Sequence, residues 1–440
     1  MGTFFEDYTS NVYGQDYLVK GNGDGTFTDV SAETGITAVS APLYGTNVTD
    51  INNDGRQDII TSPYCRTRGS VWKNMGDGTF SDVAAAVGYD AHTMGGDSGQ
   101  PLCQWAAPPA DFDNDGDIDL FINLVHGGND ANEGRSTIVL NSEGLGGFKL
   151  EWAINRILWE DPQAEHRAED YAFWFDMDNN GLQDLVVTQC CYSDGADKMF
   201  MLLQNWTYRF DDVTDDLGFT GAGMIPSTHG LTVLDYDLDG DDDVIVAKSK
   251  DDNHLVFLQN DVGNLKNHIS IKLVGSEGMN RSAIGARVTV TTTGFVQTRE
   301  LYAGEGHFGA QSPFIMNFGL NTIEAVESVR VRWPSDAHAD TLIENPPINQ
   351  LLVIEAGPPG VDGGPDADDG DSSDADAGTD GGTMADEGTQ TDGGTQADEN
   401  KGSSSCACTT DNAPFRKFAM FTVLFLVFVG CCRRKSKNRS

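Results

Sequence analysis

The sequence predicts an all-β protein: β-propeller-type repeats in an incomplete or open ring, then a small β domain, a disordered acidic linker and a C-terminal hydrophobic helix. Two observations predict this class. The apolar runs are short, rich in Val, Ile, Leu and Phe, and bounded by Gly, Asn and Asp, and glycine occurs 51 times. This composition is typical of short strands joined by tight turns. An acidic segment also recurs four times at nearly constant spacing, which indicates a repeat architecture.

The four acidic segments share the pattern D-x-[DN]-x-[DN]-G-x-x-D. They begin at residues 50, 111, 176 and 235, so their starts are 61, 65 and 59 residues apart, and an apolar run follows each one. A second landmark keeps step with them, because an apolar run ends in Asn and a turn then leads to an aromatic residue. Its copies are Asn22 with Phe27, Asn74 with Phe80, Asn141 with Phe148, Asn205 with Phe210, and Asn260 without an aromatic. Units of this length with three or four strands resemble propeller blades.

The spacing within each acidic segment suits a hard cation. Side-chain oxygens at positions 1, 3 and 5 can face one point, Gly at position 6 permits a sharp turn that brings the carbonyl of position 7 inward, and Asp at position 9 closes the shell. The EF-hand loop uses the same first four ligand positions but ends in Glu at position 12. Here a strand follows position 9, so we expect a β-hairpin setting. The predicted ligands are Asp50, Asn52, Asp54, Arg56, Asp58, Asp111, Asp113, Asp115, Asp117, Asp119, Asp176, Asp178, Asn180, Leu182, Asp184, Asp235, Asp237, Asp239, Asp241 and Asp243, with Arg56, Asp117, Leu182 and Asp241 acting through the backbone carbonyl.

Calcium is the predicted ion. Oxygen ligands without histidine or thiolate favour Ca²⁺ over Zn²⁺ or copper, and Mg²⁺ is disfavoured because it keeps several waters. Carboxylates that converge without a cation repel one another. A single segment of this kind would be interpreted as a solvated turn without metal, but four copies in phase favour metal binding. We expect the ions to stiffen the loops and to stabilise the fold by mass action.

Charge and cysteine content limit the function classes. The net charge is −40, from 68 acidic and 28 basic residues, which disfavours nucleic acid as a partner because phosphate binding needs clustered Lys and Arg. The eight cysteines form no CxxC pair, so a zinc ribbon or thioredoxin-type site has little support. A Cys65–Cys103 disulfide is an open alternative if the compartment is oxidising.

On these motifs, residues 1–265 resemble FG-GAP/VCBS calcium-binding repeats, the blades of integrin-type propellers. Residues 266–356 resemble the ASPIC/UnbV domain that follows such repeats in the cartilage-acidic-protein-like family; the matching stretches begin at Ile269, Asn280, Gly304, Asn317 and Val329. The resemblance implies an extracellular calcium-binding protein with a poorly defined ligand and no catalytic residues to carry over.

The same segment is predicted to be a β domain from its residues alone. Apolar and polar residues alternate over 269–273 and 287–290, as in strands with one buried face. Trp333 and Pro334 end a further strand, since Pro suits a strand terminus or edge. Asn280, Arg281 and Arg287 either form a polar site or fix a turn.

The tail changes composition abruptly. Residues 357–405 are predicted to be a self-repelling, disordered linker, because 357–400 hold 13 acidic residues and no basic one. Residues 406–440 contain Cys406 and Cys408, an apolar run over 418–432 and a basic end at 433–435. That run is shorter than the ~20 residues of a membrane span, and the basic end suits the positive-inside rule.

This layout resembles C-terminal sorting tails of the myxobacterial kind, which implies that Cys406 or Cys408 marks processing and anchoring. A plain C-terminal membrane anchor, a transmembrane helix, is the alternative. In either case we expect the protein at the cell surface, attached to the membrane by its C-terminus.

The predicted function is a secreted, cell-surface-anchored calcium-binding protein, acting as a structural, adhesion or ligand-binding module. Its expected partner is an unknown extracellular protein or glycan. The alternative is a propeller-based extracellular hydrolase or lyase, with candidate residues His92, His126, His166, His229 and His307. No nucleophile motif surrounds these scattered histidines, so we expect no enzyme activity.

The first repeat lacks an acidic segment. In the four complete units the strand-end Asn lies 24 to 30 residues after the segment starts, and counting back from Asn22 by those lengths passes Met1. The hypothesis that follows is that this chain is a fragment of a longer secreted protein.

Overall fold

A computed structural model describes the following residues: 5–7, 12–13, 17–36, 43–63, 68–89, 93–94, 100–101, 104–124, 136–142, 149–153, 157–158, 169–189, 199–218, 228–248, 255–304, 311, 313–360 and 425–428. Contacts divide the chain into two units, Met1–Gly363 with Phe421–Ser440, and Gly364–Met420. Every described residue belongs to the first unit. Most of the predicted linker and all eight cysteines lie outside the described residues, so the Cys65–Cys103 pairing and the roles of Cys406 and Cys408 stay predictions.

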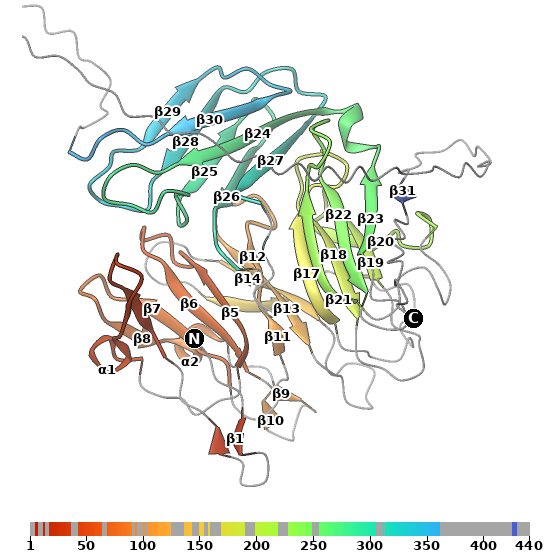
Figure 1. Ribbon diagram of the computed structural model, residues 1–440. Helices are drawn as coiled ribbons and strands as arrows, with labels where there is room; N and C mark the ends of the chain where they lie inside the picture. The colour runs from red at the N-terminus through yellow and green to blue at the C-terminus, as the bar shows by residue number, and fades with distance from the viewer. Residues whose placement is uncertain are drawn as a thin grey trace, which may run out of the picture. The chain divides into compact units, whose positions relative to one another are not determined.

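The described chain is nearly all β, which confirms the predicted fold class (Figure 1). Four successive antiparallel sheets carry the repeats. The first has β5 (Leu43–Thr49), β6 (Asp58–Pro63), β7 (Val71–Asn74) and β8 (Phe80–Asp82), and the second has β11 (Gln104–Ala106), β12 (Pro109–Ala110), β13 (Asp119–Leu124), β14 (Thr137–Asn141) and β15 (Leu150–Ala153). The third has β17 (Glu169–Phe175), β18 (Asp184–Gln189), β19 (Met199–Asn205) and β20 (Arg209–Asp212), with β16 (Ile157–Leu158) parallel to β20. The fourth has β21 (Thr228–Leu234), β22 (Asp243–Lys248), β23 (Leu255–Asn260) and β31 (Phe425–Phe428).

Each acidic segment is the loop of a β-hairpin, as predicted. In all four, the residue before position 1 pairs with the aspartate at position 9, and the pairs are Thr49 with Asp58, Ala110 with Asp119, Phe175 with Asp184, and Leu234 with Asp243. A strand therefore precedes each loop as well as following it. The identical register means that the loops present equivalent atoms at equivalent places.

Shorter elements surround these sheets. The hairpin of β3 (Val19–Gly21) and β4 (Phe27–Asp29) contains the first Gly-rich turn, where Asp24 Oδ1 accepts from the Thr26 amide at 2.9 Å, and Asp77 and Thr79 repeat this contact at 2.9 Å between β7 and β8. The remaining elements are β1 (Phe5–Asp7), β2 (Val12–Tyr13), β9 (Thr93–Met94), β10 (Gln100–Pro101), α1 (Ser31–Thr34) and α2 (Ala84–Val87).

The hydrophobic core of the repeats lies between successive sheets. One cluster joins the first sheet to the second through residues such as Ile60 and Leu120, another joins the second to the third through Phe121 and Leu185, and a third joins the third to the fourth. Among the described residues no core cluster joins the fourth sheet to the first. Each sheet therefore buries its apolar side chains against its neighbours in chain order, as stacked repeats do.

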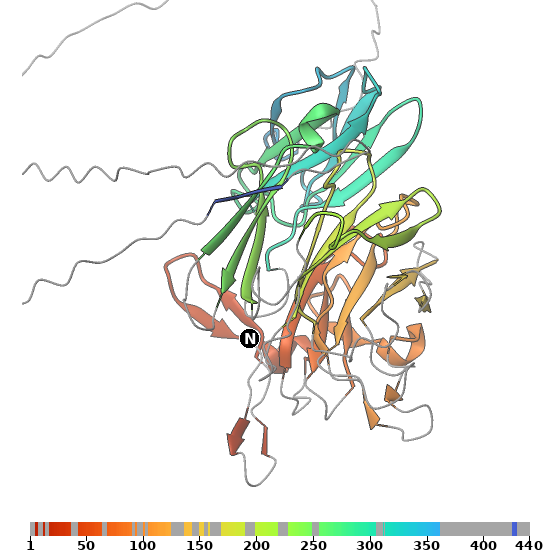
Figure 2. The same ribbon diagram turned by 90° about the vertical axis from the view of Figure 1, so that its right-hand side faces the viewer.

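A separate β domain follows the one-turn 3₁₀ helix η1 (Gly263–Leu265). One sheet has the order β27 (Ile315–Asn321), β24 (Asn267–Val274), β30 (Leu351–Glu355), and the other has β26 (Val296–Glu300), β25 (Arg287–Thr291), β28 (Ser328–Arg332), β29 (Thr341–Glu344). The two sheets enclose one apolar core (Figures 1 and 2). The strands predicted over 269–273 and 287–290 lie in β24 and β25, so this part of the prediction is confirmed.

The predicted C-terminal helix is corrected at the four of its residues that the structure describes. They form β31, which pairs antiparallel with β23. The sequence Phe-Leu-Val-Phe is aromatic and β-branched in character, and such residues favour strands. In the described part of the chain, no helix combines the length and the apolar character needed to cross a bilayer.

Truncation of a core side chain in the β domain tests the assigned core. Phe318 is fully buried in β27, so we expect Phe318→Ala to lower the free energy of unfolding by about 3–5 kcal/mol. Val353 is 49% exposed on β30 of the same sheet, and Val353→Ala should change it by no more than ~0.5 kcal/mol. Urea denaturation of the full chain measures both; equal effects would contradict the assignment.

Candidate metal centre

The four acidic loops share one hydrogen-bonded frame. The carboxylate at position 1 accepts from the backbone amide of position 6 in every loop, at 2.8 to 3.2 Å, and the side-chain oxygen at position 5 accepts from the amide of position 7, at 2.7 to 3.4 Å. These short-range bonds fold the side chains at positions 1 and 5 inward.

The backbone makes this folding possible with two left-handed residues per loop. The glycines at position 6 have φ of 88°, 92°, 94° and 99° in chain order, a region that residues with a Cβ rarely adopt. Position 4 is also left-handed and is occupied by Asn53, Asn114, Asn179 and Leu238, with φ between 50° and 61°. Asn tolerates this conformation better than most residues, which explains its presence in three of the four loops.

Three loops bring carboxylates together into groups that could hold a metal ion. The groups are Asp111 with Asp113 and Asp115, Asp176 with Asp178 and Asp184, and Asp235 with Asp237 and Asp239. Within each group, one oxygen per residue lies within 4.8 Å of the others. Asp111 is 2% exposed and its Oδ1 has no hydrogen-bond partner. Since a buried anionic oxygen without a partner is costly, this atom indicates a missing positive ligand.

The aspartate at position 9 also accepts hydrogen bonds from the sheet, which the sequence did not predict. Its Oδ1 accepts from the backbone amide at the end of the third strand of the sheet, at 2.7 to 2.8 Å in all four repeats. In the last three loops its Oδ2 also accepts from the amide of position 2, at 2.8 to 3.0 Å. The carboxylate therefore fastens the loop to the sheet, and only Asp184 also joins one of the three carboxylate groups.

The electrostatics of the loops favour a bound cation. Burial raises the pKa of Asp111 well above its usual range, and the neighbouring carboxylates of Asp115 and Asp113 raise it further. Burial, with Asp178 next in effect, raises the pKa of Asp176 to about 7. Burial likewise raises the pKa of Asp243 to about 6. A dication among these groups would reverse this effect, because it favours their charged form.

The first loop differs from the other three. Arg56, at position 7 of this loop, donates from Nη2 to Asp54 Oδ2 at 2.5 Å, and Arg332 of β28 forms an ion pair with Asp50 Oδ2. Asn52 Nδ2 donates to Asp54 Oδ2 as well, at 2.9 Å. Guanidinium groups therefore pair with two carboxylates of the first loop, and no metal-binding group of the described residues includes this loop.

Neighbouring loops are joined by amide side chains. Asn53 donates to the carbonyl of Gly116, Asn114 to that of Gly181, and Asn179 to that of Gly240, at 3.3, 3.1 and 2.9 Å. In each case position 4 of one loop contacts the glycine at position 6 of the next. The loops thus form one connected row.

A second set of contacts runs in the opposite direction. Asn141, Gln204 and Asn260, at the ends of the third strands, donate to the position 2 carbonyls of the preceding loops at 2.6 to 2.8 Å. The predicted strand end at Asn205 is confirmed, since β19 ends there, but the contact with the preceding loop is made by Gln204, one residue earlier. Asn205 instead accepts from the Thr207 amide in the following turn, at 3.0 Å.

The β domain contacts this row of loops through Arg287, a candidate from the sequence, and through Glu300, which the sequence did not identify. Glu300 accepts from the Asp50 amide and from Gln57 Nε2, at 3.1 and 2.7 Å, and is itself paired with Arg287 at 3.3 Å. Arg287 also donates to the Asp50 carbonyl at 2.9 Å. Of the two alternatives for Asn280, Arg281 and Arg287, Asn280 fixes a turn through two bonds to Ile284, whereas Arg287 belongs to the polar contact with the first loop.

The third and fourth loops are contacted in the same way. Asn317 Nδ2 donates to Asn179 Oδ1 at 3.1 Å, and Lys266 Nζ pairs with Asp178 at 3.0 Å. Asn264 donates to the carboxylate of Asp239 at 2.5 Å. Polar residues spaced along an alternating strand gave no sign in the sequence that they face another domain.

Of the twenty predicted ligands, the structure groups nine in three clusters. Asn180 lies in the frame of the third loop, and Asp58, Asp119 and Asp243 bind the loop to the sheet. In the first loop Asp50 and Asp54 contact arginines and Asn52 donates to Asp54. The four position 7 carbonyls remain predictions.

Comparison with known families agrees with the motifs. Residues 50–122 match the FG-GAP-like repeat, and residues 276–359 match the family described as ASPIC and UnbV. The chain contains FG-GAP-like repeats and an ASPIC/UnbV domain. The family resemblance predicted from the acidic loops and the β domain is therefore confirmed, whereas the sorting tail stays a prediction.

The chain is also similar to cartilage acidic protein 1. The mouse (Mus musculus) and human (Homo sapiens) proteins are each 25% identical over 334 residues, which is 74% of this chain and 47% or 46% of theirs. This chain thus spans about half the length of the curated relatives it matches.

Two solved structures are similar to parts of this chain. A lectin of Agrocybe aegerita that recognises non-reducing terminal N-acetylglucosamine has a TM-score of 0.35 at 20% identity, covering 56% of this chain and 57% of the lectin. The V. cholerae biofilm matrix protein Bap1 has a TM-score of 0.27 at 11% identity, covering 69% of this chain and 59% of that chain.

The difference between the first FG-GAP loop and the others predicts the metal stoichiometry. We expect three Ca²⁺ per chain by calorimetric titration, and a fourth, weaker site in the double variant Arg56→Gln/Arg332→Gln, because it frees Asp54 and Asp50. Arg330→Gln, on the same strand as Arg332 but paired with Asp340, should leave three. Four ions in the unaltered chain would contradict the account of the first loop.

The raised pKa values predict that calcium displaces protons. Because the folded, metal-free pKa of Asp176 is about 7 and that of Asp243 about 6, both are partly protonated near pH 6.5, and their unfolded pKa is about 3.9. Between those values the folded form binds more protons than the unfolded one, so metal-free stability falls as pH rises.

The measurement is calcium calorimetry at pH 6.5 in buffers of different ionisation enthalpy. We expect the observed enthalpy to vary with the buffer, corresponding to at least one proton released, and to vary less with the buffer as the pH is raised. Buffer-independent enthalpy at pH 6.5 would show that the loop carboxylates are already ionised.

Proposed function

We propose that the protein is an extracellular, calcium-stabilised binding module, in which ions hold the FG-GAP loops in the form that the ASPIC/UnbV domain contacts. The observation that carries this proposal is the convergence of three carboxylates in each of three loops, with Asp111, Asp176 and Asp184 buried. The second domain contacts the third loop of the chain through Asn317 and Lys266. Ca²⁺ suits these groups because it accepts six to eight oxygen ligands in flexible geometry. In the second loop Asp111, Asp113 and Asp115 would hold it, in the third Asp176, Asp178 and Asp184, and in the fourth Asp235, Asp237 and Asp239.

A binding or adhesive role is favoured over catalysis. The carboxylates with raised pKa at positions 1, 3, 5 and 9 of the loops belong to the metal-binding groups or bind the loops to the sheet, and none is paired with a described nucleophile. The partner we propose is an extracellular protein or glycan.

The C-terminal segment, with Cys406 and Cys408 before an apolar run and a basic end, would hold the module at the cell surface. Mass spectrometry of the mature C-terminus tests that part: an intact basic end at 433–435 would exclude processing.

Chelation tests the central claim. A ligand at 100 times its Kd adds about 2.7 kcal/mol per site, and 1 kcal/mol shifts the melting temperature by about 2–4 °C for domains of 150–250 residues. We therefore expect EGTA to lower the melting temperature by several degrees, and calcium, not magnesium at equal concentration, to restore it.

Loop variants supply the control. Asp111→Asn with Asp113→Asn should remove one ion and reduce the response to EGTA by about a third, while Asp216→Asn, an exposed aspartate outside the loops, should leave it unchanged. A melting temperature of the unaltered protein that does not change on addition of EGTA would refute calcium stabilisation.

A further inference from the structure

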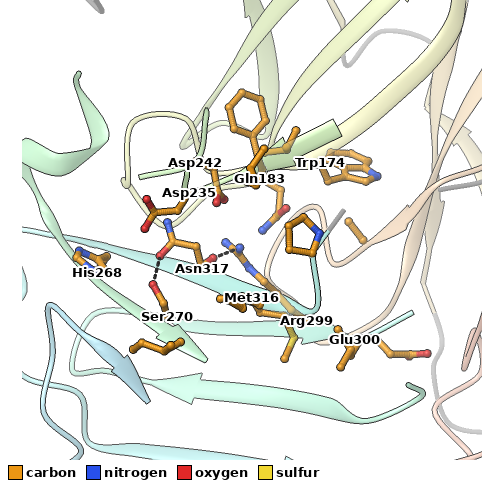
Figure 3. Close-up of a pocket in the computed structure, with 18 of the residues that line it drawn as sticks. Trp174, Gln183, Asp235, Asp242, His268, Ser270, Arg299, Glu300, Met316 and Asn317 are labelled. Carbon is orange, nitrogen blue, oxygen red and sulfur yellow. Dashed lines mark hydrogen bonds between the residues drawn. The ribbon is translucent and has the colours of Figure 1, made fainter. Parts of the chain in front are cut away.

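A cavity of about 540 Å³ lies where FG-GAP loops meet the ASPIC/UnbV domain. This volume is in the range of ~300–1,000 Å³ typical of small-ligand sites. One wall comes from the second, third and fourth repeats and the other from β24, β26 and β27 (Figure 3). Nothing in the loop chemistry described above requires this space.

Both domains contribute apolar and polar side chains to the cavity. Trp174, Phe175, Leu301 and Met316 supply apolar surface. The Trp174 ring is held in place because its Nε1 donates to the Pro108 carbonyl at 3.0 Å. An aromatic side chain anchored at its polar edge presents a fixed face to a ligand.

Arg299 lines the cavity as a hydrogen-bond donor whose position is fixed by its neighbours. Its guanidinium lies 4.6 Å from the centre of the Phe318 ring and donates to the Asn317 carbonyl. With its amide oxygen turned toward the guanidinium, Gln183 accepts from Nε and Nη2 at 2.7 and 2.6 Å. The arginine is thus held from three sides, and ligand binding would cost it little side-chain entropy.

Asp242 is the acceptor beside it. It occupies position 8 of the fourth loop, the same place that Gln183 has in the third, and both side chains are directed toward Arg299 (Figure 3). Within the described part of the chain the Asp242 carboxylate receives no hydrogen bond. Asp242 is not a member of the fourth metal-binding group, so its carboxylate oxygens are available to a ligand.

The charges around the cavity select the ligand. Asp242 and Glu300 oppose an anion, and Arg299 opposes a cation once ions neutralise Asp111, Asp235 and Asp239. An apolar molecule would displace water from Asp242 and Arg299 without replacing its hydrogen bonds, which is unfavourable. A neutral molecule with adjacent hydroxyl groups can donate to Asp242, accept from Arg299 and pack its carbon face on Trp174.

We propose that this cavity binds a neutral saccharide, one ring of which lies between Trp174 and the Arg299–Asp242 pair. The site is built from both domains, so it exists only where they are docked. The proposal rests on the proposed function in one respect, because the ions neutralise three carboxylates in the wall.

The test is saturation-transfer NMR of the full chain with a panel of methyl glycosides of neutral sugars, at saturating calcium, followed by calorimetry of those that bind. We expect at least one glycoside to bind. Asp242→Asn should weaken it ~10- to 100-fold, because a hydrogen bond to a charged group is lost. Glu344→Gln, which removes one exposed carboxylate of the ASPIC/UnbV domain outside the cavity, should have no effect.

A second variant guards against misfolding. Leu238 is 78% exposed and lines the cavity, so Leu238→Trp can obstruct it without disturbing a core, and it should also weaken binding at least tenfold. Each variant is checked for unchanged calcium stoichiometry, which reports an intact fold.

The outcomes separate this proposal from the proposed function. If calcium binds but no glycoside does, or if both cavity variants bind as the unaltered chain does, the saccharide site is overturned and calcium stabilisation stands. If a glycoside binds in a manner sensitive to both variants while calcium does not bind, the cavity stands and the proposed function falls.

Discussion

The repulsion among converging carboxylates is the constraint on which the rest of the structure depends. A glycine at position 6 folds each loop so tightly that aspartates two residues apart face one point. Burial and mutual repulsion raise their pKa values, so the folded chain needs positive charge at each loop. Three loops leave room for an ion, and the first receives guanidinium groups, one of them from a domain almost 300 residues away in sequence. A bound ion and a guanidinium group both reduce the repulsion among the carboxylates of a loop.

The sequence predicted the parts of this arrangement that are local. The pattern of aspartates and glycine is sufficient to place four hairpin loops, because the turn conformation is set by residues within nine positions. The register of each hairpin, with position 9 opposite the residue before position 1, follows from that turn. The alternation in β24 and β25 likewise identified the second domain.

What the sequence could not predict depends on long-range contacts. Asp184 and Asp119 have the same place in the pattern, yet only Asp184 lies in a carboxylate group. Arg332 and Arg330 both lie on β28, but Arg332 reaches the first loop while Arg330 pairs with Asp340. The third repeat shows the same limit, because the strand ends at Asn205 as predicted but Gln204 is the residue that contacts the preceding loop. Charged residues on alternating strands carry no signal of the partner they will meet.

Each asparagine at position 4 contacts the next loop along the chain, and the fourth loop has no asparagine at this position. Asn53, Asn114 and Asn179 each hold the next glycine turn, but the fourth member is Leu238, left-handed like the others and largely exposed. A leucine has no group with which to hold a further loop. The row of hydrogen bonds between loops therefore ends at Leu238, and the fourth loop receives hydrogen bonds from Asn264 and Asn317 instead of from a further repeat.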